Sequence, residues 1–205
     1  MAGIGGDIKD VLQELGTPFV LVKLDGSELT GESLDYEMYY EQSTEFIRQF
    51  AYSGDFQYDS QVEGGDMLVF DNKHFLVMNV KKTLFENEPV DHSNFFIETN
   101  TLGRISRGGE VRDPITKEIV TTWATVLDNV YGTMVSLATA DNDMGSVNTI
   151  LDRFTLFTQG FSSVRPGDRW YPDVNDLTEY YQIMMIDKYR FTGLLTLKLI
   201  EDARK

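Results

Sequence analysis

The chain has 205 residues and a net charge of -15, from 33 acidic and 18 basic side chains. This acidic excess argues against a protein that grips nucleic-acid phosphates over a broad basic face, and against a polybasic membrane binder. The chain has no cysteine, which excludes disulfides, thiolate metal sites and cysteine nucleophiles. It has only 2 histidines, which disfavours a multi-histidine metal centre. The length fits one large domain or two of about 100 residues each.

Membrane and export signals are not expected from the sequence. Apolar runs stay well short of the roughly 18 residues that a transmembrane helix needs. Residues 1–10 have Gly and Asp where a signal peptide has a basic and then an apolar run. We therefore expect a protein that is made in a cytoplasm and does not bind membranes.

The acidic excess is concentrated in the first half of the chain. Residues 1–103 carry 19 acidic and 6 basic side chains, a net charge of -13, whereas residues 104–205 carry 14 and 12, a net charge of -2. Between Asp25 and Asp66 the only base is Arg48. One interpretation is a solvated face that keeps the protein soluble. The other is an acidic wall that repels a polyanion or attracts a basic partner, with these candidate channel or interface acids: Glu32, Asp35, Glu37, Glu41 and Glu45.

In chain order, the first predicted element is a short helix over residues 7–15. Ile8, Val11, Leu12 and Leu15 form one apolar stripe at helical spacing. Gly16 follows the last of them, at the position where a left-handed residue ends a helix. We expect this helix to pack on its own domain, with docking into a neighbouring subunit as the alternative.

The rest of the first half is predicted to be β-structure, with strands over 19–23, 34–40, 67–70, 74–81 and 94–99. The second of these alternates: Leu34, Tyr36 and Met38 face one way, and Asp35 and Glu37 face the other. This pattern is typical of a half-buried strand, here with a carboxylate-rich outer face.

Residues 104–114 form the best candidate for a linker. They include Gly108, Gly109 and Pro114, and little that is apolar. They also include three candidate interface bases: Arg104, Arg107 and Arg112. The simple interpretation is a solvated linker, and the alternative is that these arginines bind an acidic neighbour across an interface.

The second half is again rich in predicted strands, over 119–127, 131–139, 149–157, 169–171, 179–186 and 191–200. Many short strands with turns between them favour barrels or sandwiches. The fold class predicted from the sequence is therefore mainly β.

The two halves also contain a repeated unit. Gly65-Asp66 and Gly167-Asp168 lie 102 residues apart, and each pair precedes a short strand, a turn and a second strand. Gly-Asp before a strand makes a tight turn, because Gly adopts backbone conformations that other residues resist and Asp accepts local N–H bonds. We therefore predict two tandem antiparallel β-barrels or sandwiches, over residues 1–103 and 115–205, joined by the linker 104–114.

This unit resembles the head–tail joining proteins of tailed bacteriophages, which are small β-barrel proteins also called head-closure, stopper or neck proteins. The residues that carry the resemblance are Val164, Gly167, Asp168, Tyr181, Ile183, Leu195 and Leu197 in the second half, and Val62, Gly65, Asp66, Phe75, Val77 and Phe96 in the first. These are structural positions, so no family active site can be carried over. A tandem chain departs from the single-unit members, which are about half as long.

The resemblance implies a structural protein of the virion neck. It implies a homo-oligomeric ring below the portal that connects the DNA-filled capsid to the tail, or a collar around that junction. Six copies are favoured and twelve are the alternative; the partners would be portal or adaptor proteins and tail proteins. An acidic wall suits such a sleeve, because carboxylates repel passing DNA and avoid tight ion pairs with it.

Other chemistry receives little support. The chain has no Gly-x-Ser-x-Gly nucleophile elbow and no Walker loop. Asp141, Asp143 and Asp152 faintly resemble a calcium loop, but the glycine is misplaced and the predicted flanks are strands, so an acidic turn is expected. His74 and His92 are expected to be ordinary surface or half-buried residues. No catalytic, cofactor-binding or metal-binding residue is predicted.

One alternative function stays open. Tyrosines stand among acids in the first half, at Tyr36, Tyr39, Tyr40, Tyr52 and Tyr58. They are suited to a carbohydrate- or ligand-binding β module, although a β core uses the same residue types. Paired carboxylates are also numerous enough for a glycosidase, but no single pair stands out.

Overall fold

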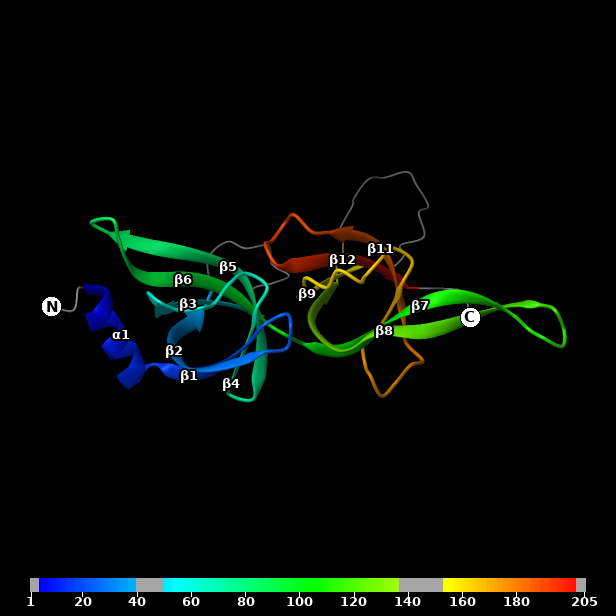
Figure 1. The fold of residues 1–205 in the computed structure, drawn as a ribbon, viewed down its shortest axis with the longest axis horizontal. Coiled ribbons are helices and arrows are strands. Elements are labelled where there is room, and N and C mark those ends of the chain that lie inside the picture. Colours follow the sequence, from blue (N-terminus) through cyan, green and yellow to red (C-terminus); the bar gives the residue numbers. More distant parts are fainter. Residues whose placement is uncertain (1–3, 40–49, 137–152, 202–205) are drawn as a thin grey trace, which may run out of the picture.

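The computed structural model describes residues 4–39, 50–136 and 153–201, which form one helix and two β-barrels lying end to end (Figure 1). The helix is α1 (Ile4–Leu15). The first barrel consists of β1 (Thr17–Val22), β2 (Glu28–Met38), β3 (Ala51–Gln57), β4 (Met67–Phe70), β5 (Lys73–Phe85) and β6 (Glu88–Glu98). The second consists of β7 (Thr101–Arg112), β8 (Ile119–Ser136), β9 (Arg153–Gln159), β10 (Arg169–Tyr171), β11 (Tyr181–Asp187) and β12 (Leu194–Glu201). The prediction of two tandem β units is confirmed.

The two barrels have the same topology. Around the first barrel the order is β1-β2-β3-β6-β5-β4, and around the second it is β7-β8-β9-β12-β11-β10, with both barrels closed. A register shift interrupts β1 between Phe19 and Leu21, and the corresponding shift interrupts β7 between Gly103 and Ile105. Residues in the paired parts of the strands of one barrel therefore have counterparts in the other, which is the pattern left by a duplication.

Helix α1 covers part of the outer surface of the first barrel (Figure 1). Leu12 is buried against the sheet, whereas Val11 and Leu15 are exposed. The helix covers Ile4–Leu15, and so includes three residues before the predicted start; Gly5 packs closely on the first barrel, since a Cβ there would lie 3.0 Å from the carbonyl oxygen of Pro89. The expectation that the helix packs on its own domain is met.

The predicted linker 104–114 is wrong, since most of it belongs to β7. Ile105 is fully buried in the second barrel, and Arg104 to Ser106 pair with β10 on one side and β8 on the other. The connection between the barrels is instead the short segment after Glu98 and before Thr101. The glycines misled the prediction because they lie in an extended ribbon, where Gly108 leaves room for the ring of Trp123.

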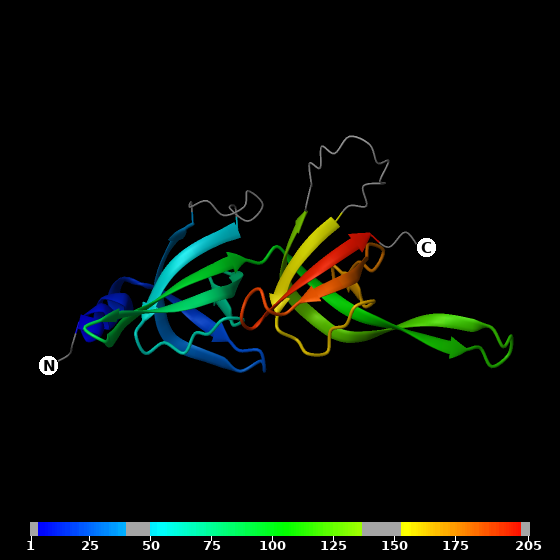
Figure 2. The ribbon, with the colours of Figure 1, turned by 90° about the horizontal axis from the view of Figure 1, so that it is seen from above.

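That ribbon projects beyond the second barrel, at the end far from α1 (Figures 1 and 2). We call residues 107–124 the arm. From Arg107 to Arg112, β7 pairs with β8 residues Ala124 to Ile119, whereas β10 pairs only as far as Ser106. A two-stranded ribbon in water is marginally stable by itself, so a projecting arm of this kind gains from a covering partner.

Each barrel has its own apolar interior, and a third cluster joins the two. The third cluster combines Leu76, Met78 and Ile97 of the first barrel with Phe157 and Leu194 of the second. Polar contacts surround it. The His74 ring stacks on Tyr131 at a centroid distance of 3.9 Å, Thr133 Oγ1 donates to Glu98 O at 2.8 Å, and Gln159 Nε2 donates to Gly65 O at 3.1 Å.

Candidate functional site

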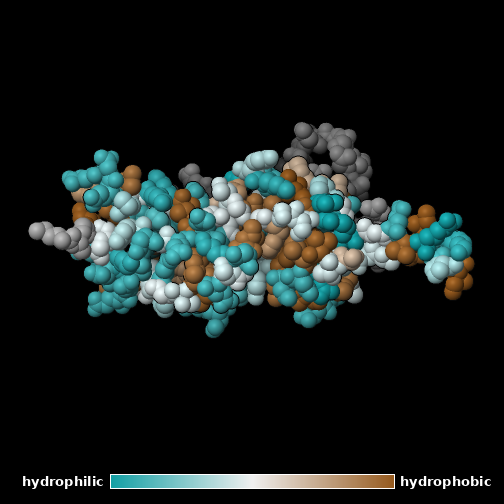
Figure 3. Space-filling view, viewed as in Figure 1, coloured by the Kyte–Doolittle hydropathy of each residue, from teal (hydrophilic) through white to brown (hydrophobic). Residues whose placement is uncertain are grey.

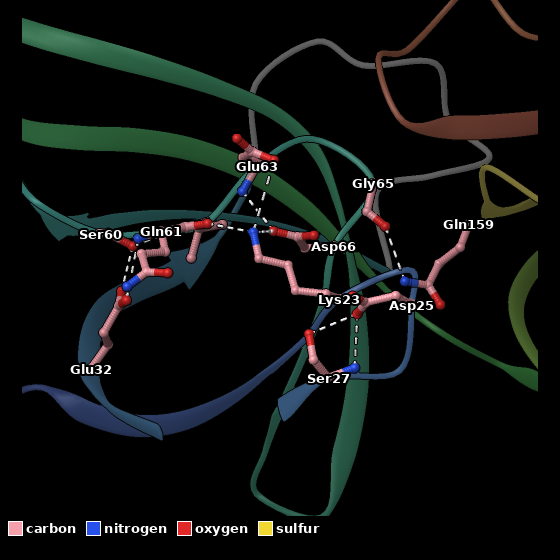
Figure 4. A network of polar contacts seen from close by, with 11 residues as sticks. Lys23, Asp25, Ser27, Glu32, Ser60, Gln61, Glu63, Gly65, Asp66 and Gln159 are labelled. Carbon is pink, nitrogen blue, oxygen red and sulfur yellow. Dashed lines mark hydrogen bonds and ion pairs between the residues drawn. The ribbon is translucent and has the colours of Figure 1, made fainter. Parts of the chain in front are cut away.

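The Gly65-Asp66 turn is held by a lysine from the first strand of its barrel (Figure 4). The Asp66 carboxylate accepts a hydrogen bond from Lys23 Nζ at 2.7 Å and another from Glu63 N at 2.8 Å. Lys23 Nζ also donates to Gln61 O at 2.6 Å. Burial raises the pKa of Asp66 above its ordinary value, despite the opposing effect of Lys23. The turn therefore ties the β3–β4 loop to the end of β1.

The second barrel builds the same turn with an arginine. Asp168 accepts from Arg107 Nε and Nη2, both at 2.8 Å, and from Arg165 N at 2.8 Å. Arg107 Nη2 also donates to Ser163 O at 2.6 Å. The predicted role of both Gly-Asp pairs as structural turns agrees with this geometry. The role of the two bases was not predicted, although Lys23, which directly follows β1, is the counterpart of Arg107 in β7.

The predicted acids separate into three groups. Asp35 and Glu37 lie exposed on the outer face of β2, as the alternation predicted. Glu32 lies apart from them and accepts hydrogen bonds from Ser60 Oγ and Gln61 N. Glu41 and Glu45 fall outside the described residues.

Asp35 and Glu37 line a groove of about 550 Å³ on the first barrel, which we call the acidic groove. Asp55 of β3 completes it and is the direct cross-strand partner of Asp35. Like charges placed opposite one another destabilise a sheet, so a cationic group in the groove would relieve a cost. Asp55 was not among the predicted channel or interface acids.

The floor of the acidic groove is polar as well. Ser93 Oγ donates to Asp55 Oδ1 at 2.8 Å. Asn94 borders the groove with its backbone, whereas its side chain lies on the buried face of β6, where Nδ2 donates to His92 O at 2.8 Å. Within the part of the chain that the structure describes, no three His, Asp or Glu side chains are grouped to hold a metal ion. The groove thus suits a partner that brings donors and positive charge.

The three predicted interface arginines have different partners. Arg104 forms an exposed ion pair with Asp128, with Nε 3.0 Å from Oδ1. Arg107 is engaged by the buried Asp168. Arg112 lies on the arm, where its Nε donates to Lys117 O at 3.2 Å. Acidic partners for two of these arginines therefore lie within the second barrel itself.

The arm exposes apolar side chains. Ile115 at its tip is 88% exposed, and Val111, Ile119 and Val120 are also exposed. In Figure 3 brown apolar atoms appear along the arm, whereas the first barrel is largely teal on this face. At the base of the arm, the Arg169 guanidinium lies 3.7 Å from the ring of Trp123 and 4.1 Å from that of Tyr180. The arm is therefore firmly rooted, and its end is available for contacts.

The two histidines occupy unlike environments. His74 stacks between the barrels, and burial lowers its pKa. His92 is 3% exposed, and burial again lowers its pKa. Neither ring nitrogen of His92 has a partner among the described residues. The expectation of a surface or half-buried role is therefore wrong for His92, because it occupies an inward-facing position of β6 opposite Phe56.

Comparison with known proteins gives no match to a protein family, a curated protein or a solved structure. The helix in the described residues is too short and too polar to cross a membrane. The calcium-like segment 141–152 lies outside the described residues.

Proposed function

We propose that the chain is a structural component of the virion neck of a tailed bacteriophage. It would form a ring that connects the portal and capsid to the tail around the DNA channel, or a collar at that junction. The observation that supports this proposal is the tandem of two like barrels with unlike ends: α1 at one end, and the projecting arm at the other (Figure 1). Unlike ends favour head-to-tail contacts, which close into rings when the rotation permits.

The charge distribution fits a passage for DNA. The first half carries a net charge of -13, whereas the second half carries -2. A ring multiplies this charge and produces a field that keeps phosphates from adhering to the wall. DNA is then contacted weakly at most. A ring of six chains, the favoured number, would present twelve barrels; twelve chains are the alternative.

Native mass spectrometry and electron microscopy of the purified chain test the ring. We expect a closed oligomer that becomes populated as the concentration is raised, and a chain that is recovered with portal or tail proteins from purified particles. A chain that stays monomeric at all concentrations and is missing from such particles would refute the proposal.

A ligand-binding module is the second candidate, and one observation favours it. A pocket of about 480 Å³ beside the β3–β4 loop is lined by Val62, Val80, Lys82 and His92 of the first barrel and by Thr192 of the second, and the His92 ring has no hydrogen-bond partner among the described residues. Pockets of this size and mixed polarity bind small molecules, and a sugar would match its polar groups and aliphatic walls. Titration with glucose and N-acetylglucosamine, followed through the two histidine ring signals, tests it. Saturable shifts at His92 but not at His74 would support binding, and unchanged spectra would exclude it.

A further inference from the structure

The contact between the two barrels uses defined outer surfaces. On the second barrel it uses the outer faces of β8, β9 and β12, including Thr133, Val135 and Phe157. On the first barrel it uses Leu76, Met78 and Ile97 of β5 and β6. We call the first surface the docking face and the second the receiving patch. Because the barrels are built alike, each surface has a counterpart on the other barrel.

The counterpart of the docking face is the acidic groove. Asp35 pairs with Asp55 across β2 and β3, as Thr133 pairs with Phe157 across β8 and β9. Glu37 is two residues beyond Asp35, as Val135 is two residues beyond Thr133. The side chains that bury the docking face against the first barrel are therefore replaced, at the free end of the chain, by carboxylates.

The counterpart of the receiving patch lies on the outer face of the second barrel. Leu76 pairs with Ile97, and the equivalent pair is Gln182 with Ile200. Met78 stands at a bulge of β5, and Met184 stands at the same bulge of β11. Met184 is 52% exposed, so this second patch has an uncovered apolar centre.

Basic residues border the second patch. Lys198, the counterpart of Phe95, is cross-strand to Thr155, and its Nζ donates to Thr155 Oγ1 at 2.9 Å. Arg169 neighbours Gln182 across β10 and β11. The patch therefore presents Lys198 and Met184, with Arg169 stacked on Trp123 and Tyr180 at its border and Asp187 acting electrostatically on Lys198. The acidic groove presents three carboxylates, with which Lys198 can pair, and each of the two surfaces is the counterpart of a surface already joined within the chain.

We propose that the second patch (Gln182, Met184, Lys198 and Ile200) docks into the acidic groove of a second copy of this chain. The contact between copies would repeat, with charge in place of apolar packing, the contact between barrels. It rests on the proposed ring and specifies which surfaces close it. The arm projects from the second barrel, which also carries the second patch, and would lie along the neighbour, which would cover its exposed valines and isoleucines (Figure 1).

Engineered disulfides test this contact directly, because the chain has no cysteine of its own. One protein carries Asp55→Cys, a second carries Met184→Cys, and a control carries Glu28→Cys at an exposed position outside the groove. Under mild oxidation we expect the Asp55–Met184 mixture to form disulfide-linked dimers about tenfold faster than the Glu28–Met184 mixture, since docking raises the effective concentration. Equal rates would overturn the contact, and so would a preference of Asp55→Cys for itself.

Charge reversal provides an independent test with the cysteine variants. Glu37→Lys added to the Asp55→Cys protein should slow cross-linking, and so should Lys198→Glu added to the Met184→Cys protein. Combining the two reversed proteins should restore the rate; failure to restore it would overturn the assigned pairing of surfaces.

The contact and the ring can fail separately. Ring-sized particles that lack the Asp55–Met184 cross-link would refute the proposed contact, but they would support the proposed ring. A chain with both cysteines that forms open ladders, and no closed species by native mass spectrometry, would keep the contact and overturn the ring.

Discussion

The two barrels share a topology but fill their interiors differently. In the first barrel, Phe19 of β1 and Leu68 of β4 are both buried in the core. Their counterparts in the second barrel are Gly103 and Trp170, and a Cβ on Gly103 would lie 2.3 Å from Trp170 Cη2. The indole thus occupies the space that the phenylalanine fills in the first barrel. The same barrel topology accommodates either pair of side chains, phenylalanine with leucine or glycine with tryptophan, provided that their combined volume is kept.

The largest effect on stability is expected from substitutions at Gly103 and Trp170, which replace the phenylalanine and leucine of the first barrel. Gly103→Phe should cost about 3 kcal/mol or more of unfolding free energy, since the ring would overlap Trp170 and the carbonyl oxygen of Tyr171. Trp170→Leu should also cost about 3 kcal/mol, because it leaves a cavity. Combining them recreates the residue pair of the first barrel and should cost clearly less than the sum. Urea unfolding followed by circular dichroism measures this, and strict additivity would contradict the proposed equivalence.

The next largest loss of stability is expected at the Gly-Asp turns, and it should differ between the two barrels. Asp168 is 2% exposed and accepts three hydrogen bonds, two of them from one guanidinium, so Asp168→Ala should cost about 3 kcal/mol. Asp66→Ala should cost less, about 2 kcal/mol, because Asp66 accepts only two such bonds, from Lys23 Nζ and Glu63 N. Urea unfolding of both variants, with Asp25→Ala in an exposed turn as the control, checks the order. Equal losses at Asp66 and Asp168 would show that the arginine and the lysine are interchangeable here.

How far the sequence predicts this molecule depends on the range of the interactions. Local signals were sufficient for the Gly65-Asp66 and Gly167-Asp168 turns, for the alternation that exposes Asp35 and Glu37, and for the division into two β units. The linker prediction failed because glycines in a ribbon have the same composition as glycines in a loop. What distinguishes them is the pairing of Ile105 with Trp170, which is a long-range contact.

The acidic groove was predicted only in part, for the same reason. Asp35 and Glu37 belong to one strand, and strand alternation is visible in the sequence. Asp55 joins them through the register of β2 on β3, which sequence spacing does not fix. The bases that hold the Gly-Asp turns are likewise brought in by closure of each barrel. The equivalence of Lys23 and Arg107 depends on the strand registers of the two barrels, which sequence spacing does not show.

A smaller effect concerns polar residues inside the first barrel. His92 corresponds to Leu195, since each stands on the sixth strand of its barrel opposite counterparts, Phe56 and Thr158. We expect His92→Leu to raise the unfolding free energy by about 1 kcal/mol at neutral pH, because both buried ring nitrogens of His92 lack a partner among the described residues. Urea unfolding at neutral pH measures the gain, and a loss would indicate that His92 is bonded through water or a ligand.

The same variant should change the dependence of stability on pH. Burial lowers the pKa of His92 and of His74 from the ordinary 6.5, so the folded state takes up protons less readily than the unfolded chain. Stability is therefore retained above this value and is lost as the pH falls below it. His92→Leu should make the acid limb shallower. His74→Phe, which keeps an aromatic ring against Tyr131, should also make it shallower without the gain at neutral pH.

The smallest effects on stability are expected from substitutions of exposed arginines. Arg104 lies on the body of the second barrel, and Arg112 lies on the arm. Arg104→Ala removes an exposed pair with Asp128 and should lower the melting temperature only slightly, an effect that salt should diminish. Arg112→Ala on the arm should change stability by less than about 0.5 kcal/mol, since it removes one exposed bond to a backbone carbonyl. If the arm lies along a neighbouring copy, Arg112→Ala should instead alter the cross-linking rate of the cysteine pair while thermal unfolding of the isolated chain stays unchanged. Thermal scans in low and high salt, run beside the cross-linking assay, separate an arm that serves assembly from one that serves the fold.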